Sequence, residues 1–193
     1  MKITLKDGTV KEYVESMSVL QIAADISEGL ARAALAMKVD GKVCQINAEV
    51  NEDANVEFLT FDDEEGRRVY RHTEAHVLAQ AVKRLYPNAL LAFGPATDDG
   101  FFYDVDMPES VTGDVLAKLE AEIKKIIKEN IPVVRSVVPK QEARKIMSDR
   151  NETYKVEHID NLSDDEDITI YTQGEFIDLC AGPHLTSTGK LKA

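Results

Sequence analysis

The chain has 193 residues, of which 44% are hydrophobic and 30% are charged, and its formal net charge is −12 at pH 7. It contains no run of about 18 consecutive apolar residues, and its N-terminus alternates like a β-strand where a signal peptide would have an apolar core. These features exclude a membrane protein and predict a cytoplasmic one, while the two distant cysteines, Cys44 and Cys180, exclude a disulfide framework.

The negative charge is shared along the chain, and this limits the kind of partner. Residues 1–62 carry 6 basic and 11 acidic side chains, and the remainder carries 17 and 24. A protein that binds the phosphate backbone normally has a basic face, so any contact with nucleic acid must be local. The candidate patches are residues 67–71 and the cluster of Lys124, Lys125 and Lys128, although taken alone both are better explained as solvated helix faces.

The first 61 residues predict a β-grasp, ubiquitin-like domain. Two pairs of strands alternate around Asp7-Gly8 and Asp40-Gly41, which are strong hairpin signals because such turns need positive φ. Between the hairpins, Ser18 can cap a helix that we expect to stop at Gly29. A final strand follows in the stretch NVEFLTF, so two hairpins would pack across one helix.

Residues 62–66 are polar, contain a glycine and are predicted to form a linker to a second domain at 67–193. A helix is expected from Arg67 to Tyr86, where Pro87 ends it, followed by a hairpin around residues 98–100. The further expected elements are helices at 112–129 and 141–150 and strands at 133–138, 154–159 and 168–173. The predicted fold class is therefore α+β, a β-grasp domain followed by helices packed on a largely antiparallel sheet.

Two histidines of the first long helix are candidate functional residues. His72 and His76 are four residues apart, so both imidazoles project from one helix face about one turn apart. The apolar residues that follow them lie on other faces, which leaves this side free to line a cleft. On its own, the spacing is explained more often by surface or core histidines than by a site.

A second pair, Cys180 and His184, has the same spacing in the stretch FIDLCAGPHL. Gly182 and Pro183 argue against a helix there, so this pair should come from a strand end and a loop. The four side chains are of the types that zinc prefers, which suggests a tetrahedral metal site. Without metal, the same set would make a pocket that activates water, with one imidazole as base, another as acid and the thiol as a wall.

Other polar residues are less specific. Asp178 shares a strand face with Cys180 if the strand persists, and it could orient a histidine or hold an ammonium group. Lys155, placed on a predicted strand, would ordinarily face solvent. His158 is expected at the surface.

Four stretches of the chain, in order and spacing, resemble editing-domain motifs of bacterial threonyl-tRNA synthetases, and the opening β-grasp is similar to the TGS domain of that family. The resemblance covers the whole chain, and its four stretches are RHTEAHVLAQAVKRLYP, AFGPATDDGFFYDVD, YKVEHI and FIDLCAGPHL.

The resemblance implies a domain that hydrolyses serine wrongly attached to threonine tRNA. It places six residues on the editing site of the family, with Tyr103 on a neighbouring pocket strand; the six are His72, His76, Lys155, Asp178, Cys180 and His184. The family is understood to edit without metal, so no cofactor is expected.

The resemblance also suggests individual roles. His72 would activate or position water, and Lys155 would lie near the terminal ribose. His76 and His184 would position water and ester. Asp178 would bind the α-amino group of serine.

The chain departs from the family in two respects. Ala181 stands where the family commonly has arginine, which removes any contact that this side chain makes with phosphate or carboxylate. The sequence also stops before the catalytic core with its ATP and zinc sites, so this chain is expected to be a fragment that does not charge tRNA by itself. Its expected partners are the acceptor end of threonine tRNA and the rest of the synthetase; we expect a monomer here and a dimer for the full enzyme.

Two alternatives remain at the level of sequence. One is a free-standing, zinc-dependent hydrolase of mischarged tRNA, with zinc at His72, His76, Cys180 and His184. The other is a non-catalytic module that docks RNA or protein. The net charge argues against unaided RNA affinity, and a purely structural role would leave the two spaced pairs as unrelated accidents.

Overall fold

The computed structural model describes residues 1–164 and 166–192, and over these residues the chain forms two compact units. The first comprises residues 1–70 together with 183–186, and the second comprises residues 71–182 and the chain from 187 onward. The predicted division into 1–61, 62–66 and 67–193 stays a prediction. Residues 64–66 of the expected linker are, however, already helical, because helix α3 spans Glu64–Leu85.

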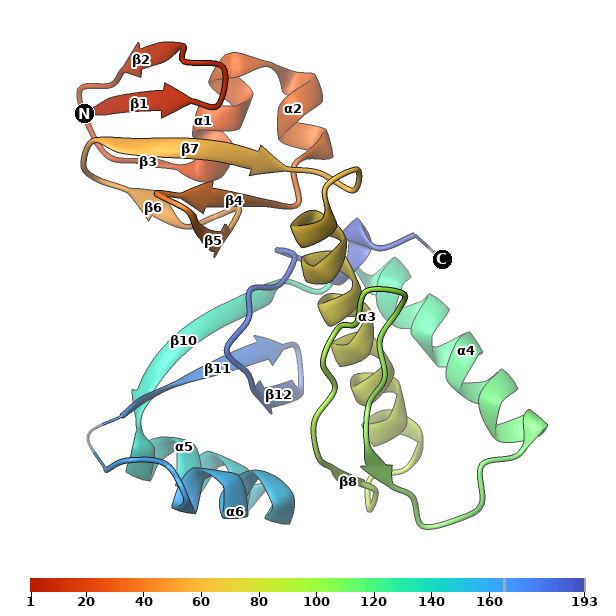
Figure 1. Cartoon of the computed structure of the whole chain (residues 1–193). Coiled ribbons are helices and arrows are strands. Elements are labelled where there is room, and N and C mark those ends of the chain that lie inside the picture. The colour runs from red at the N-terminus through yellow and green to blue at the C-terminus, as the bar shows by residue number, and fades with distance from the viewer. Residues whose placement is uncertain (165, 193) are drawn as a thin grey trace. The chain divides into compact units, whose positions relative to one another are not determined.

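The sheet of the first unit has the strand order β2-β1-β7-β4-β5 (Figure 1). β1 and β7 are parallel, and the other neighbours are antiparallel. A small ladder joins β3 to β6. The strands are β1 Lys2–Leu5, β2 Val10–Glu12, β3 Met17–Ser18, β4 Ala36–Val39, β5 Lys42–Gln45, β6 Glu49–Val50 and β7 Ala54–Leu59.

Local sequence explains most of this unit. Asp40 and Gly41, which join β4 to β5, have φ of 46° and 83°, as the predicted hairpin requires. Ser18 caps α1, Val19–Ile26, in a capping box with Gln21. The predicted stop at Gly29 was wrong, because Ser27 ends α1 and at once caps a second helix, α2, Glu28–Ala33.

The core of the first unit contains residues of α1 and of the sheet. Ile3, Val19, Ile22 and Met37 are fully buried there. Together with the strand order, this packing confirms the predicted β-grasp.

The second unit contains helices and antiparallel strands, as predicted. Beyond α3, its elements are β8 Leu90–Leu91, β9 Val105–Asp106, α4 Gly113–Glu129, β10 Val133–Pro139, α5 Lys140–Asp149, α6 Thr153–Asp160, β11 Asp167–Gln173, β12 Phe176–Leu179 and the short 3₁₀ helix η1 Thr188–Lys190. The main sheet has the order β10-β11-β12, and β8 pairs with β9 at the ends of the predicted hairpin. Thr112 caps α4 as expected.

The strand predicted at residues 154–159 was wrong, because this segment is helix α6. Its buried residues are Lys155 and Ile159, which are four apart and therefore share a helix face. In a segment of only six residues, the pattern of apolar and polar residues fits both the 3.6-residue period of a helix and the two-residue period of a strand. Only tertiary packing decides between the two.

The two faces of the hairpin β11–β12 differ. Ile168, Ile170 and Leu179 pack with α5 and α6 in one apolar cluster. The alternate residues Tyr171, Gln173 and Asp178 are also buried, but they meet side chains of α3. Strand alternation therefore turns a polar face of the hairpin toward a polar face of α3.

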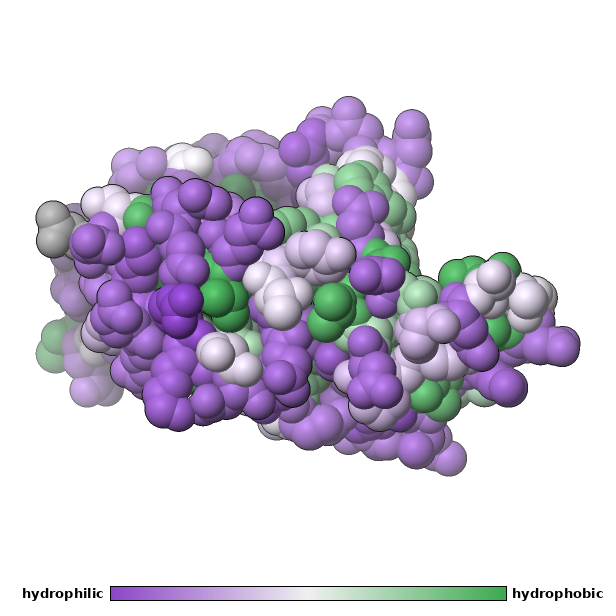
Figure 2. Space-filling model, turned by 90° about the horizontal axis from the view of Figure 1, so that it is seen from below, coloured by the Kyte–Doolittle hydropathy of each residue, from purple (hydrophilic) through white to green (hydrophobic). Residues whose placement is uncertain are grey.

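The view from below shows a surface made mostly of hydrophilic residues, with small hydrophobic patches between them (Figure 2). Among the described residues, every helix is too short or too polar to cross a bilayer.

Candidate active site

A pocket of about 460 Å³ in the second unit collects most of the predicted site residues. Its lining comes from α3, the segment after β8, α6, β11 and the end of β12, and includes His72, His76, Phe93, Tyr103, Lys155, His158, Asp178, Cys180 and Ala181. A hollow of about 520 Å³ over α5 and α6 is larger, but its lining has no histidine, cysteine or lysine. The chemistry therefore lies in the smaller pocket.

The histidines of α3 lie one turn apart as the spacing predicts. The ring centroids of His72 and His76 are 5.3 Å apart, with an interplanar angle of 75°. His72 is half-buried, whereas His76 is only 3% exposed. Burial lowers the pKa of His76 to about 4, although the nearby carboxylate of Asp178 opposes this shift. His76 is therefore a neutral imidazole at neutral pH.

Asp178 on β12 is the centre of a buried polar group. Its Oδ1 lies 2.8 Å from Nζ of Lys155, and its Oδ2 accepts a hydrogen bond of 2.6 Å from the hydroxyl of Tyr103. Nε2 of His76 lies 3.4 Å from the same oxygen. These partners explain how a carboxylate that is 2% exposed can be tolerated.

Lys155 does not face solvent, contrary to the prediction, and is 1% exposed. Its Nζ donates to the hydroxyl of Tyr103 at 3.2 Å and lies 4.2 Å from the ring centroid of Phe93. Its side chain is therefore held between the carboxylate of Asp178, the phenol of Tyr103 and the aromatic face of Phe93.

Cys180 follows the end of β12 and, as predicted, lies on the same side as Asp178. Its Sγ is 3.2 Å from Nε2 of His72, and the backbone N–H of Gly182 donates to the sulfur at 3.3 Å. Burial raises the pKa of Cys180 to about 12. The residue is thus a neutral thiol, suited to a pocket wall or a hydrogen bond and unsuited to nucleophilic attack.

His184 is fully buried. One candidate ligand atom from each of His72, His76, Cys180 and His184 lies within 4.8 Å of the other three. The donor types fit zinc, but ligand atoms around a tetrahedral zinc ion lie about 3.4–3.8 Å apart. Zinc binding would therefore require the four atoms to adopt separations of this size and the thiol of Cys180 to lose its proton.

Sequence reasoning named Tyr103 but missed Phe93, another aromatic residue of the pocket. Phe93 supports Lys155, and the ring of His158 packs on Phe93 with centroids 4.9 Å apart. His158 is exposed, as predicted, yet it also lines the pocket. No local pattern marks Phe93, since its partner Lys155 lies in a distant helix.

Comparison with known proteins gives matches at both ends of the chain. Residues 1–60 match the TGS domain family, and residues 168–193 match the family described as the threonyl and alanyl tRNA synthetase second additional domain. Each family covers less than half of the chain.

Similarity to individual proteins extends along the whole sequence. The chain is 53% identical over 193 residues to the threonine–tRNA ligase of Acetivibrio thermocellus, which is 100% of this chain and 30% of that protein. It is 51% identical over 193 residues to the enzyme of Clostridium tetani, with the same coverage. For the enzyme of Symbiobacterium thermophilum the identity is 48% over 191 residues, covering 99% of this chain and 29% of that protein.

These relatives are much longer than the chain, which spans about 30% of their length. The chain therefore contains a TGS domain and a segment of the second additional domain, and along its whole length it is similar to the N-terminal region of bacterial threonine–tRNA ligases.

Proposed function

We propose that this chain is the N-terminal part of a threonine–tRNA ligase, and that its second unit hydrolyses the ester of serine wrongly attached to threonine tRNA. The observation that supports this most directly is the buried group of Lys155, Asp178 and Tyr103 beside His72 and His76 in one pocket. A polar pocket with an ammonium, a carboxylate and a neutral imidazole suits an amino acid ester.

The chemistry of the substrates explains the need for such a site. Serine lacks one methyl group of threonine, a difference worth only about 1–3 kcal/mol in a binding pocket. A synthetic site that accepts threonine therefore also admits serine. A second site that admits serine and rejects the additional methyl group raises the overall selectivity.

The hydrolysis requires a water molecule to attack the ester carbonyl carbon while a base removes a proton from the water. We assign this role to His72, which is the less buried of the two histidines and lines the pocket. The bond between that carbon and the ribose oxygen then breaks, the ribose oxygen takes a proton, and serine leaves as the free acid.

The other residues would bind and orient the substrate. Lys155 would lie at the terminal ribose, and His76 would hold water or the ester as a neutral donor or acceptor. Asp178 would bind the α-amino group, for which it must exchange one of its present partners, Tyr103 or Lys155. Cys180 would form the wall that limits side-chain size, and His184 would help to position the water.

The partners follow from the same proposal. The acceptor end of threonine tRNA would enter the pocket, and the remaining part of a ligase chain would activate threonine and bind the rest of the tRNA. We expect this chain to be a monomer and the complete enzyme to be a dimer, in the cytoplasm.

The test is single-turnover deacylation of seryl- and threonyl-tRNA(Thr) by this chain, with and without a metal chelator. We expect selective, chelator-resistant loss of serine, and His72→Ala should abolish it. Unchanged hydrolysis by His72→Ala would contradict the role of His72. No hydrolysis by a folded sample would contradict the proposal that the chain edits on its own.

The cluster of three imidazoles and a thiol supports a second candidate, a zinc-dependent hydrolase. Bound zinc would act there as a Lewis acid. This candidate predicts about one zinc ion per chain and hydrolysis that a chelator removes, so the same experiment distinguishes the two.

A further inference from the structure

Four polar residues of α3 form a single line along the helix: His72, His76, Gln80 and Arg84. They are spaced by four residues, so they share one face. Only the first two line the pocket; Gln80 and Arg84 lie outside its lining. All four contact the hairpin β11–β12, its turn or Cys180 directly after β12.

Along the line of contacts, residue numbers rise in α3 and fall in β12. His72 meets Cys180, His76 meets Asp178, and Gln80 and Arg84 both meet Glu175 in the turn. Four helical residues rise by about 6 Å, and two strand residues advance by about 6.6 Å. One helical turn therefore matches two residues of β12, and a shift of either element would disrupt every pair together.

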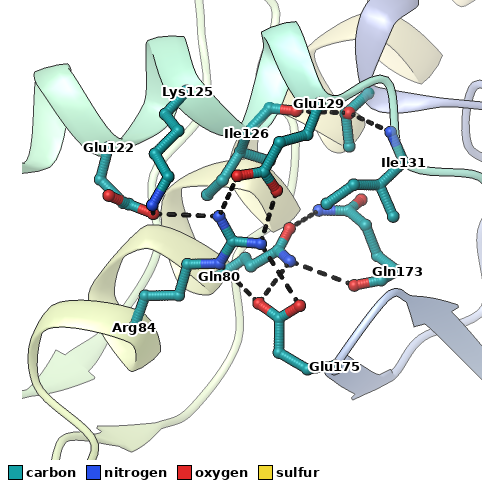
Figure 3. A network of polar contacts seen from close by, with 10 residues as sticks. Gln80, Arg84, Glu122, Lys125, Ile126, Glu129, Ile131, Gln173 and Glu175 are labelled. Atoms are coloured by element: carbon teal, nitrogen blue, oxygen red, sulfur yellow. Dashed lines mark hydrogen bonds and ion pairs between the residues drawn. The ribbon is translucent and has the colours of Figure 1, made fainter.

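At the far end of this line, Gln80 and Arg84 belong to a network of hydrogen bonds and ion pairs with the β11–β12 hairpin and α4 (Figure 3). Gln80 is fully buried, and its Nε2 donates to the backbone oxygen of Gln173 at 3.1 Å and to Glu175 at 2.8 Å. The side chain of Gln173 returns a hydrogen bond of 2.5 Å to Oε1 of Gln80. The amide of Gln80 thus fixes both the backbone and a side chain of the hairpin.

Arg84 adds charge to this anchor. Its guanidinium donates to Glu175 at 2.6 Å from Nε, to Glu129 at 2.8 Å and to Glu122 at 3.0 Å (Figure 3). One arginine therefore joins α3 to α4 and to the β11–β12 turn. Hydrogen bonds between charged groups are stronger than those between neutral groups, and they fix the relative orientation of the two side chains. At the pocket end, Sγ of Cys180 lies 3.2 Å from Nε2 of His72, and Nε2 of His76 lies 3.4 Å from Asp178.

We propose that Gln80, Arg84 and Glu175 are positioning residues, which set the register of β12 against α3 and thereby hold Cys180 and Asp178 opposite His72 and His76. The expected effect on the rate of hydrolysis rests on the proposed function. The expected effect on the register of β12 does not, because it is a property of the folded chain without substrate. None of the three residues lines the pocket, so they act through the residues that do.

The first test needs no substrate and uses the thiol of Cys180 as a reporter of the register. In a Cys44→Ser chain, Cys180 is the one remaining cysteine, and its rate of modification by an aromatic disulfide reagent is measured. We expect Arg84→Met and Gln80→Leu to raise this rate at least tenfold while the circular dichroism spectrum stays unchanged.

Loss of stability alone also exposes a partly buried thiol, so a control of matched stability is required. Val115→Ala, in the buried face of α4, removes two methyl groups far from the turn in the chain and should raise the rate only as global unfolding predicts. Equal modification rates in Arg84→Met and Val115→Ala at equal stability would overturn the proposal.

The second test is single-turnover hydrolysis of seryl-tRNA. Arg84→Met should lower the rate constant at saturating enzyme about tenfold and change the half-saturating concentration less than twofold, because the pocket lining is intact but misaligned. Glu175→Gln, which keeps an acceptor for Gln80, should retain more activity than Glu175→Leu. Val115→Ala should match the parent chain.

The two tests separate the two proposals. If the parent chain does not hydrolyse seryl-tRNA, the proposed function fails, and the thiol experiment still decides whether the anchor sets the register. If hydrolysis is present but its rate constant is unchanged in folded Arg84→Met, the positioning role is refuted and the proposed function stands.

Discussion

Lys155 of α6 and Asp178 of β12 form an ion pair of 2.8 Å in which both side chains are at most 3% exposed. The two residues are separated by helix, loop and strand, and Tyr103 from a third segment bonds to both. A pair withdrawn from water in this way is sensitive to the loss of either partner, because the remaining charge is left buried.

Lys155→Met should therefore lower the free energy of unfolding by about 3–5 kcal/mol, since Asp178 loses its cationic partner. Urea denaturation followed by circular dichroism measures this change. Lys145→Met is the matched control, because it breaks the exposed pair of Lys145 and Asp149 and should cost less than about 1 kcal/mol. Similar losses in both variants would contradict the buried character of the Lys155 pair.

The low pKa of His76 makes folding depend on pH. Burial holds the pKa at about 4 in the folded chain, against an ordinary value of 6.5. Between these values the unfolded chain binds the additional proton, so stability falls as the pH falls from about 6.5 to about 4, by up to about 3 kcal/mol.

An NMR titration of the His76 ring should show no protonation above pH 5. His76→Gln should flatten the dependence of stability on pH in the same window. A ring that titrates near pH 6.5 in the folded chain would refute this prediction.

We expect Glu175 to make the stability of the fold depend on pH in a second, more acidic range. Its hydrogen bond from Arg84 lowers the pKa of the carboxyl group to about 2, below the usual 4.5. A depressed carboxylate pKa stabilises the fold above about pH 4.5, and this stabilisation is lost as the pH falls toward 2. Melting temperatures measured between pH 2 and pH 7 should therefore decline less steeply at the acidic end for Glu175→Gln than for the parent chain. The effect is moderated because the side chain of Glu175 is 58% exposed.

Position 182 requires glycine for two reasons, its backbone conformation and the lack of space for a side chain. Its φ is 70°, and a Cβ there would lie 2.0 Å from the hydroxyl oxygen of Tyr171. Gly182→Ala should destabilise the chain by more than about 1 kcal/mol and displace the N–H that bonds to the sulfur of Cys180, which lowers the rate of seryl-tRNA hydrolysis. Gly113→Ala, in the first turn of α4 with open space around it, should leave both properties unchanged. Equal stability of the two variants would contradict the steric argument.

The local sequence correctly predicted the features that depend on interactions between residues close together in the chain. The turns at Asp7-Gly8 and Asp40-Gly41, the caps Ser18 and Thr112 and the end of α3 before Pro87 follow from backbone conformation and local hydrogen bonds. The same reasoning failed for α6, where six residues fit two periods, and for Gly29, where Ser27 supplied an earlier end and a new cap.

The sequence by itself predicted the β-grasp, the α+β class and the shared face of His72 and His76, because hairpin turns, helix caps and the periodicity of side chains are marked by residues close together in the chain. Only the tertiary structure decided that Lys155 is buried, that Phe93 supports it and that Gln80 and Arg84 bond to the turn of β11–β12. Phe93 and Lys155 are 62 positions apart, and Gln80 and Arg84 are more than 90 positions from Glu175. These relationships depend on how helices and strands pack, and a linear pattern of residue types does not specify which polar side chains will meet.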